Sequence, residues 1–271
     1  MTPTPQQATG PRVYNAGMVE RVSLRLPRLP EAFSGLTVAV VSDLHAGFLW
    51  RRAPAVRRVV DRVNALGADL ICLLGDLVHR RRHTSTYLPL LGELSAPLGV
   101  YACLGNHERG RMWYSRHRLP VRSPSTQDWR RWYGAHDLRL LVNEALPLER
   151  DGDRLWLVGV DDPYSRHHDL AAALREVPAG DCALGLAHSP DLLDDPAVGE
   201  LDLLLAGHTH GGQVHLPGVG PVFASCRHPR RRAAGLVREN GTLLYVTRGV
   251  GEGLPFRLGC PRELTLLTLN R

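Results

Sequence analysis

Histidine, aspartate and asparagine residues occur in five short blocks of this 271-residue chain, each directly after an apolar run. In chain order the blocks read SDLHAG, LLGDLV, CLGNHE, LAHSP and AGHTHGG. Any one block has an ordinary explanation, because Asp, Asn and Gly after a strand commonly form turns or caps. Five blocks at predicted strand ends favour a shared chemical task. Their candidate ligands are Asp43, His45, Asp76, Asn106, His188, His208 and His210.

The seven side chains offer oxygen and imidazole nitrogen donors, which suit divalent metals of hard to borderline character. The five cysteines include no Cys-x-x-Cys pair, which argues against a structural zinc site and against a disulfide framework. Seven donors are too many for one tetrahedral ion, and they suit two ions about 3.5–4 Å apart that share a carboxylate. The sequence therefore predicts two divalent metal ions, and manganese, iron and zinc are all compatible with these donors.

His208 and His210 occupy alternate positions before Gly211 and Gly212. Residues i and i+2 share a side only where the backbone is extended, and they diverge where it turns. The glycine pair lets the chain pass close to a metal site without steric cost. The two histidines would therefore share a side if the strand continues through them and would diverge if it turns there. His215, five residues further on, is not expected to be a ligand and is assigned to a solvated loop.

Apolar runs and helical spacings predict the elements that carry the blocks. Strands are expected at 19–27, 36–43, 68–76, 98–106, 154–162, 181–190, 200–210, 242–249 and 262–270. Helices are expected at 53–67, 87–94 and 126–134. Ligand sites in open α/β sheets form at the carboxyl ends of strands, so the five blocks should meet at one edge of the fold.

All 33 basic residues are arginine, and the formal net charge is +6. The arginine bias fits a GC-rich genome, and the charge also fits an anionic partner such as phosphate, nucleic acid or a lipid surface. No apolar run approaches the roughly 18 residues of a membrane span, and the N-terminal residues lack the apolar core of a signal peptide. These features predict a cytoplasmic protein. They are also compatible with a peripheral position on the inner face of the membrane.

In order and composition, the five blocks resemble the calcineurin-like metallophosphoesterase superfamily, whose pattern is D-x-H, G-D, G-N-H-E, H and G-H-x-H. The stretches GHTHGGQV, LVGVDDP and YVTRGVGEGLPFRLGCPRELTLL also resemble a branch of small bacterial phosphodiesterases. That branch includes membrane-associated phosphoesterases and UDP-diacylglucosamine pyrophosphatases. The resemblance implies an α/β fold with two mixed β-sheets packed as a sandwich and flanked by helices. The tail would cover residues 1–18 and the phosphoesterase domain residues 19–271.

The same resemblance implies a role for each residue of the blocks. One metal ion would be held by Asp43, His45 and His210, and the other by Asn106, His188 and His208, with Asp76 bridging them. His107 would bind no metal and would lie near the phosphate as a general acid or charge stabiliser.

The implied activity is metal-dependent hydrolysis of a phosphodiester or pyrophosphate in a small or lipid-linked substrate, by in-line attack of a metal-bridging hydroxide. A nuclease of the same superfamily is the first alternative, although the sequence shows no DNA-binding module and argues against a nucleic-acid partner. A non-catalytic binder of anionic lipid or nucleic acid is the second, and the intact ligand set argues against it. The oligomeric state is not predicted.

Arginine-rich segments are the candidates for contact with an anionic head group or a membrane. Segment 108–118 would leave from the mouth of the site, with an ordinary surface loop as the equal alternative. Runs 80–82 and 230–232 are expected to be solvated loop charge. Arg248 is a candidate for contact with phosphate, and Asp161 and Asp162 are expected in a turn. The remaining histidines are expected at the surface, namely His79, His83, His117, His136, His167, His168 and His228.

Overall fold

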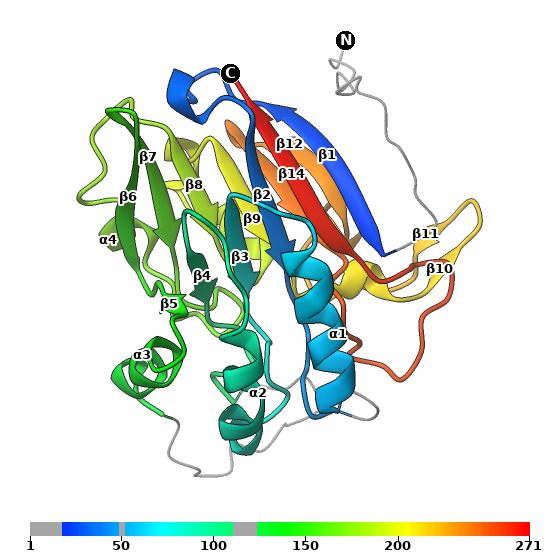
Figure 1. Ribbon diagram of the computed structural model, residues 1–271. Helices are drawn as coiled ribbons and strands as arrows, with labels where there is room; N and C mark the ends of the chain where they lie inside the picture. Colours follow the sequence, from blue (N-terminus) through cyan, green and yellow to red (C-terminus); the bar gives the residue numbers. More distant parts are fainter. Residues whose placement is uncertain (1–17, 49–51, 111–123) are drawn as a thin grey trace.

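The computed structural model describes residues 18–48, 52–110 and 124–271, and it contains two six-stranded mixed β-sheets (Figure 1). The first sheet has the order β1 (Val19–Arg25), β14 (Leu264–Asn270), β2 (Leu36–Val41), β3 (Leu70–Leu74), β4 (Val100–Cys103) and β5 (Arg139–Leu140). The second has the order β12 (Gly235–Glu239), β13 (Thr242–Val246), β9 (Leu203–Ala206), β8 (Ala183–Leu186), β7 (Asp153–Gly159) and β6 (Glu144–Arg150). The predicted pair of mixed sheets is confirmed.

The strands that carry the blocks are parallel within each sheet. β2, β3, β4 and β5 run parallel, and β14 joins β2 in the antiparallel sense. In the second sheet β13, β9, β8 and β7 run parallel between the antiparallel edge strands β12 and β6. Because parallel strands end at the same edge of a sheet, the turns after them lie together.

Alternating side chains explain how the two sheets form a sandwich. In β3, Leu70, Cys72 and Leu74 pack into the apolar core between the sheets, whereas Ile71 and Leu73 pack beneath helices. A strand covered on both faces has no need of polar alternation, and this explains its continuous apolar sequence. Helices α1 (Ala53–Asn64), α2 (Thr84–Leu91) and α3 (Thr126–Gly134) cover the outer face of the first sheet (Figure 1).

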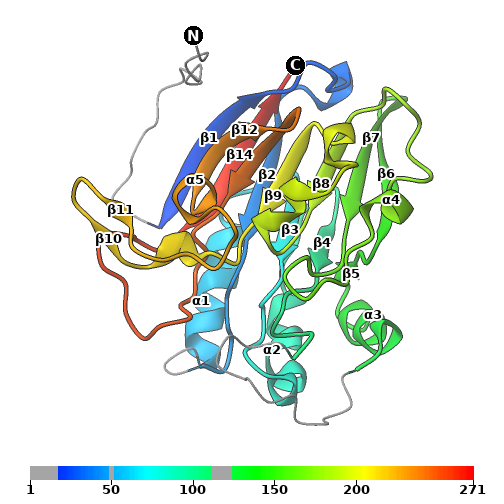
Figure 2. The ribbon, with the colours of Figure 1, turned by 180° about the vertical axis from the view of Figure 1, so that it is seen from behind.

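The outer layer on the second sheet is thinner. It consists of α4 (Leu170–Ala173) and the 3-10 helices η3 (Pro190–Asp194) and η4 (Val198–Glu200) (Figure 2). Further short elements are the 3-10 helices η1 (Glu31–Phe33), η2 (Arg81–His83) and η5 (His210–Gly212), the helix α5 (Pro229–Arg232) and the hairpin strands β10 (His215–Leu216) and β11 (Gly220–Pro221). Within the described residues, no helix is both long and apolar enough to cross a membrane.

The predicted helix at 126–134 has the observed bounds because Ser125 and Asp128 form a capping box at its start. The predicted helix at 87–94 is displaced and covers Thr84–Leu91 instead. Predicted strands end earlier than expected, since their last polar residues turn out of the sheet into the blocks. Of the expected tail, residues 1–17 lie outside the described residues.

Candidate metal and phosphate site

The five blocks meet at the carboxyl edge of both sheets. β2, β3 and β4 of the first sheet and β8 and β9 of the second each end two or three residues before the first candidate ligand of a block. Hydrogen bonds join the sheets at this edge, because His188 Nδ1 donates to the Leu74 carbonyl oxygen at 2.7 Å and the His208 amide donates to Asp43 Oδ2 at 2.9 Å. The expected meeting of the blocks at one edge is thus observed.

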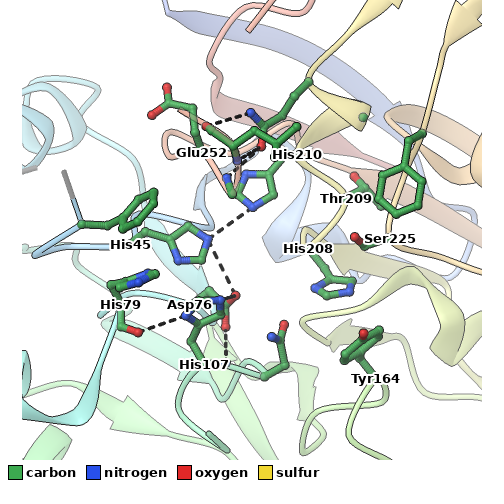
Figure 3. Close-up of a pocket in the computed structure, with 17 residues that line it drawn as sticks. His45, Asp76, His79, His107, Tyr164, His208, Thr209, His210, Ser225 and Glu252 are labelled. Atoms are coloured by element: carbon green, nitrogen blue, oxygen red, sulfur yellow. Dashed lines mark hydrogen bonds and ion pairs between the residues drawn. The ribbon is translucent and has the colours of Figure 1, made fainter. Parts of the chain in front are cut away.

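A cavity of about 340 Å³ opens at this edge (Figure 3). Of the predicted site residues, it is lined by His45, Asp76, Asn106, His107, His208 and His210. The other two, Asp43 and His188, have no exposed surface and lie behind the wall. The structure therefore brings all eight predicted residues to one place.

The backbone at this edge is left-handed at many of the candidate ligands. Asp43, His45, Asp76, His208 and His210 have φ between 46° and 68°. This conformation costs a residue with a side chain about 1 kcal/mol, and such residues gather at functional sites. The left-handed turns explain why the chain leaves the sheet soon after β2, β3 and β9 and brings these side chains together at the edge.

Gly207 is required where the two sheets approach each other. A β-carbon at this position would collide with Ser42 Oγ and with Asp43 Oδ2. Gly207 therefore lets Asp43, which follows β2 of the first sheet, approach the histidines that follow β9 of the second sheet.

One group of possible metal ligands, the first cluster, consists of Asp43, His45 and His210, whose donor atoms lie within 4.8 Å of one another. His45 Nε2 and His210 Nε2 are 3.2 Å apart, and Asp43 Oδ1 is 3.6 Å from His210 Nε2. His210 Nδ1 donates to the Gly251 carbonyl oxygen at 3.3 Å, so Nε2 of the neutral ring presents a lone pair. Burial lowers the pKa of His210 to about 4 and that of His45 well below its usual value. Both rings are therefore in the form that binds metal.

The second cluster consists of Asp76, His188 and His208, again with donor atoms within 4.8 Å of one another. His188 Nε2 lies 3.4 Å from Asp76 Oδ2, 3.1 Å from Asn106 Oδ1 and 3.0 Å from His208 Nδ1. Burial lowers the pKa of His208 to about 3. Burial also opposes a charge on His188, but the charge of Asp76 and the hydrogen bond to it raise the His188 pKa well above its usual value.

The two clusters fit divalent cations by their chemistry. Asp43 Oδ1, His45 Nδ1 and His208 Nε2 are buried and have no hydrogen-bond partner among the described residues. Buried polar atoms are normally satisfied, so an unsatisfied carboxylate oxygen such as Asp43 Oδ1 indicates a missing positive partner. A histidine that ligates a metal typically donates its other ring N–H to a carbonyl, as His188 and His210 do here.

Asp76 lies between the clusters. Its Oδ2 is 3.8 Å from His45 Nε2 of the first cluster (Figure 3). The same oxygen is 3.4 Å from His188 Nε2 of its own cluster. Buried Glu108 fixes the turn that carries it, because the Glu108 carboxylate accepts from the amides of Asp76 at 2.9 Å and Gly105 at 3.0 Å. Burial and the charge of Asp76 raise the pKa of Glu108 to about 7.

His107 faces the cavity beside Asp76. Its Nδ1 donates to the His79 carbonyl oxygen at 3.0 Å, and its Nε2 lies 3.8 Å from Asp76 Oδ2. Its amide donates to Asp76 Oδ1 at 2.8 Å. The ring is thereby fixed with one nitrogen toward the cavity and the carboxylate.

The surface position predicted for His79 is wrong. His79 is buried, lines the cavity and forms a third group of possible metal ligands with His45 and His107. Its ring stacks on Phe48 at 4.2 Å, and burial lowers its pKa to about 4. Its position three residues after Asp76 was the only available signal. The burial itself depends on a side chain from another loop.

The other histidines differ from the expectation in degree. His167 and His228 are exposed, as predicted, whereas His83, His136 and His168 are half-buried. His117 lies outside the described residues. His215 is half-buried in β10 rather than solvated, and its Nε2 contacts the Gly211 carbonyl oxygen outside the clusters.

Three arginines also differ from the expectation. Arg109, at the start of the segment expected to clamp an anion, is instead paired with Asp161. Arg248 forms ion pairs with Glu20 and Glu263 and does not line the cavity. Arg232 is buried between Asp194 and Glu239, so run 230–232 is not uniformly solvated.

Other predictions for these segments are confirmed. Arg80, Arg81 and Arg82 are exposed. Asp162 forms the expected turn by accepting from the amides of Tyr164 at 3.1 Å and Ser165 at 2.8 Å. Residues 111–118 of the arginine-rich segment lie outside the described residues.

Comparison with known proteins agrees with this geometry. Residues 36–212 match the model of the Calcineurin-like phosphoesterase family. The chain is 30% identical to the phosphodiesterase YaeI of Escherichia coli (strain K12), over 93% of this chain and 89% of that protein. It is 26% identical to the uncharacterized metallophosphoesterase YkuE of Bacillus subtilis (strain 168), over 89% and 82%. It is also 26% identical to the UDP-2,3-diacylglucosamine pyrophosphatase LpxG of Chlamydia trachomatis serovar D, over 92% and 88%. The chain therefore belongs to the calcineurin-like phosphoesterase family and is a metallophosphoesterase, a hydrolase of phosphoester bonds.

Proposed function

We propose that this chain hydrolyses a phosphodiester or pyrophosphate bond in a small or lipid-linked substrate with the help of two divalent metal ions. The observation that carries the proposal is the pair of clusters in one cavity, with Asp76 Oδ2 within 3.8 Å of a histidine from each. In this proposal Asp43, His45 and His210 would hold one ion, and Asn106, His188 and His208 the other. Asp76, which lies between the two groups, would help to hold both.

The ions, which on these donors can be manganese, iron or zinc, would lower the pKa of water and neutralise phosphoryl oxygens. The chain itself supplies orientation and a proton. His107 is held by the His79 carbonyl oxygen at Nδ1, so its Nε2 is the atom that can donate to the leaving oxygen.

The substrate class follows from the cavity walls and the relatives. Phe48, Phe223 and Leu254 give the cavity apolar sides around its polar floor. Such walls suit a phosphoester attached to an apolar group. By name, two relatives are a phosphodiesterase and a UDP-2,3-diacylglucosamine pyrophosphatase. A nuclease is less well supported, because a nucleic-acid channel needs a basic groove along the backbone. The cytoplasmic location and the domain limits of 19–271 remain predictions.

A substrate panel with His107→Ala tests the proposal. With manganese or zinc, the protein should hydrolyse bis(4-nitrophenyl) phosphate faster than 4-nitrophenyl phosphate, and a UDP-linked diacyl lipid faster than plasmid DNA. His107→Ala should keep its metal content and lose about 10²–10⁴-fold in kcat, because a positioned proton donor contributes that much. His167→Ala, at an exposed histidine, is the matched control and should behave as wild type.

Each part of the proposal has a result that would contradict it. Absence of turnover with every metal would show that the chain is not an enzyme. Loss of metal in His107→Ala, measured by mass spectrometry of the metal content, would show that His107 is a ligand and not a proton donor.

A further inference from the structure

Exposed large apolar side chains are concentrated in two short segments. Among the residues that the structure describes, those with the greatest exposure all lie at 216–223 or 254–258. They are Leu216 (44%), Val219 (56%), Val222 (58%), Phe223 (68%), Leu254 (38%), Phe256 (55%) and Leu258 (56%). We call this set the apolar rim. Apolar patches of this kind on soluble domains mark binding surfaces.

The two segments form one surface. The His215 amide donates to the Leu258 carbonyl oxygen at 2.8 Å, and the Leu258 amide donates to the Gln213 carbonyl oxygen at 2.8 Å. Figures 1 and 2 both show the β10–β11 hairpin and the loop before β14 together at one edge of the molecule. The rim is therefore continuous although its halves are more than 30 residues apart in the sequence.

Buried polar residues hold the rim outward. The Gln213 amide group donates to the carbonyl oxygens of Leu254 at 3.1 Å and Phe256 at 2.7 Å, and its Oε1 accepts from the Gly253 amide at 2.7 Å. Arg257, with a side chain only 8% exposed, donates to the His210 carbonyl oxygen at 2.9 Å. Charged side chains usually face solvent and large apolar ones the interior. Here the arginine side chain is turned inward, whereas its neighbours Phe256 and Leu258 are exposed. A segment fixed in this way cannot turn its apolar side chains inward.

The charge around the rim is one-sided. The sequence contains no Asp or Glu from 203 to 238. Helix α5 packs against β11, and the neighbouring side chains of Arg227 and Arg231 are 59% and 69% exposed, although they also approach Asp194 and Glu239. Apolar side chains flanked by arginines suit the interface of a membrane with anionic lipids, where the chains enter the acyl boundary and the arginines contact head groups.

The rim is also the mouth of the cavity. Phe223 and Leu254 belong to the rim and line the cavity that contains both clusters. We propose that the apolar rim inserts into the interface of an anionic phospholipid bilayer and so presents the cavity to a phosphoester carried by a membrane lipid. The docking step stands on the surface alone, and the lipid-borne phosphoester rests on the proposed function.

Vesicle sedimentation of the metal-loaded full chain tests the docking step. The protein should bind vesicles of phosphatidylcholine with phosphatidylglycerol more tightly than phosphatidylcholine alone. The triple variant Val219→Ser, Val222→Ser, Phe256→Ser changes exposed residues that do not line the cavity. Its binding should fall about tenfold or more, because the inserted apolar surface is lost. Its turnover of soluble bis(4-nitrophenyl) phosphate should stay unchanged.

Charge variants and a fluorescent reporter sharpen the test. Arg231→Gln should weaken binding to the anionic vesicles, whereas Arg131→Gln, on the distant helix α3 with a side chain 72% exposed, should not. Val222→Trp should show a blue shift of its added tryptophan emission when anionic vesicles are added. The absence of any shift would contradict insertion even if a serine variant misfolded.

Other outcomes separate this inference from the proposed function. Full turnover of the soluble diester without vesicle binding would overturn the docking step and leave the function intact. Vesicle binding without turnover of any phosphoester would overturn the function and leave the docking step intact. If sedimentation velocity shows a dimer that the triple variant abolishes, and vesicles do not bind, the rim is an interface between copies and the inference is wrong.

Discussion

The two clusters of the cavity have the same composition but different supports. Each contains one aspartate and two histidines. In the second cluster, His188 is held by the Leu74 carbonyl oxygen at the end of β3, and the turn of Asp76 is held by Glu108. These contacts come from the edge of the buried sheets.

The first cluster is supported by the loop that forms half of the apolar rim. His210 donates to the Gly251 carbonyl oxygen, and Arg257 donates to the carbonyl oxygens of His210 and Gly251. One cluster is therefore built into the core of the fold, whereas the other is coupled to the surface that we propose to dock on a membrane. Changes at the rim loop should therefore affect the two positions unequally.

Asp76→Asn should have the largest effect because Asp76 is common to both clusters. Replacing the carboxylate removes a charge that both ion positions share, and metal-based charge stabilisation is worth several kcal/mol. We expect loss of metal from both positions and a fall in kcat of about 10³-fold or more, given tenfold per 1.36 kcal/mol. Metal content and turnover of the soluble diester measure this. Asp151→Asn, an exposed aspartate with the same left-handed backbone, is the matched control.

One result for Asp76→Asn would contradict the view that Asp76 is common to both clusters. If this variant kept one ion at full affinity, Asp76 would belong to a single cluster. The two positions would then be independent.

Arg257→Met should have a smaller effect, confined to the first cluster. The change keeps an unbranched side chain that can fill part of the same space and removes the donors to the His210 and Gly251 carbonyl oxygens. Loss of a group that orients a ligand typically lowers metal affinity about 10–100-fold. Titration with metal should therefore show one weakened ion and one unchanged ion. If the affinities for both ions fell equally, or if neither affinity fell, Arg257 would not distinguish the two clusters.

Arg262→Met provides the control for this change. Arg262 lies on the same loop, is 45% exposed and pairs with Glu252 rather than with the carbonyl oxygens beside His210. Its replacement should leave the affinities for both ions as they are in wild type.

The residues of the two clusters can be predicted from the sequence. The different contacts that hold the two clusters in place cannot. Asp43, Asp76 and His188 could be placed at one edge because each follows a continuous apolar run, and such runs end together in parallel sheets. Arg257 gives no such signal. It satisfies carbonyl oxygens that are distant in the sequence, and composition alone would place an arginine between Phe256 and Leu258 in solvent.

The edge strand β6 and the burial of His79 were missed for related physical reasons. β6 contains Pro147 and is half-exposed, so its apolar alternation is weak, and only an edge position allows proline there. His79 becomes buried because Phe48 stacks on it, and that contact depends on how two loops close. The local sequence pattern predicts a strand or helix and the end of it that carries the functional residues. Contacts between loops decide which further residues become part of the site.

The smallest predicted effect is a difference in the pH dependence of the two ion positions. The pKa of His188 lies well above its usual value, so the metal-free second cluster holds a proton at neutral pH that a metal must displace. The pKa of His210 is about 4 and that of His45 lies well below its usual value, so the first cluster has no such proton at pH 6. Below the His188 pKa, each unit of falling pH should weaken the second position about tenfold, since one proton competes with the metal. The first position should stay constant between pH 7.5 and 6.

Variants that isolate each position make this measurable. His210→Ala leaves the second cluster and should release one proton per zinc bound, seen by calorimetry in buffers of different ionisation enthalpy. His188→Ala leaves the first cluster and should release none. If His210→Ala bound zinc without releasing a proton, the charge on His188 would not distinguish the clusters. The loop that supports His210 would then be the main remaining difference between the supports of the two clusters.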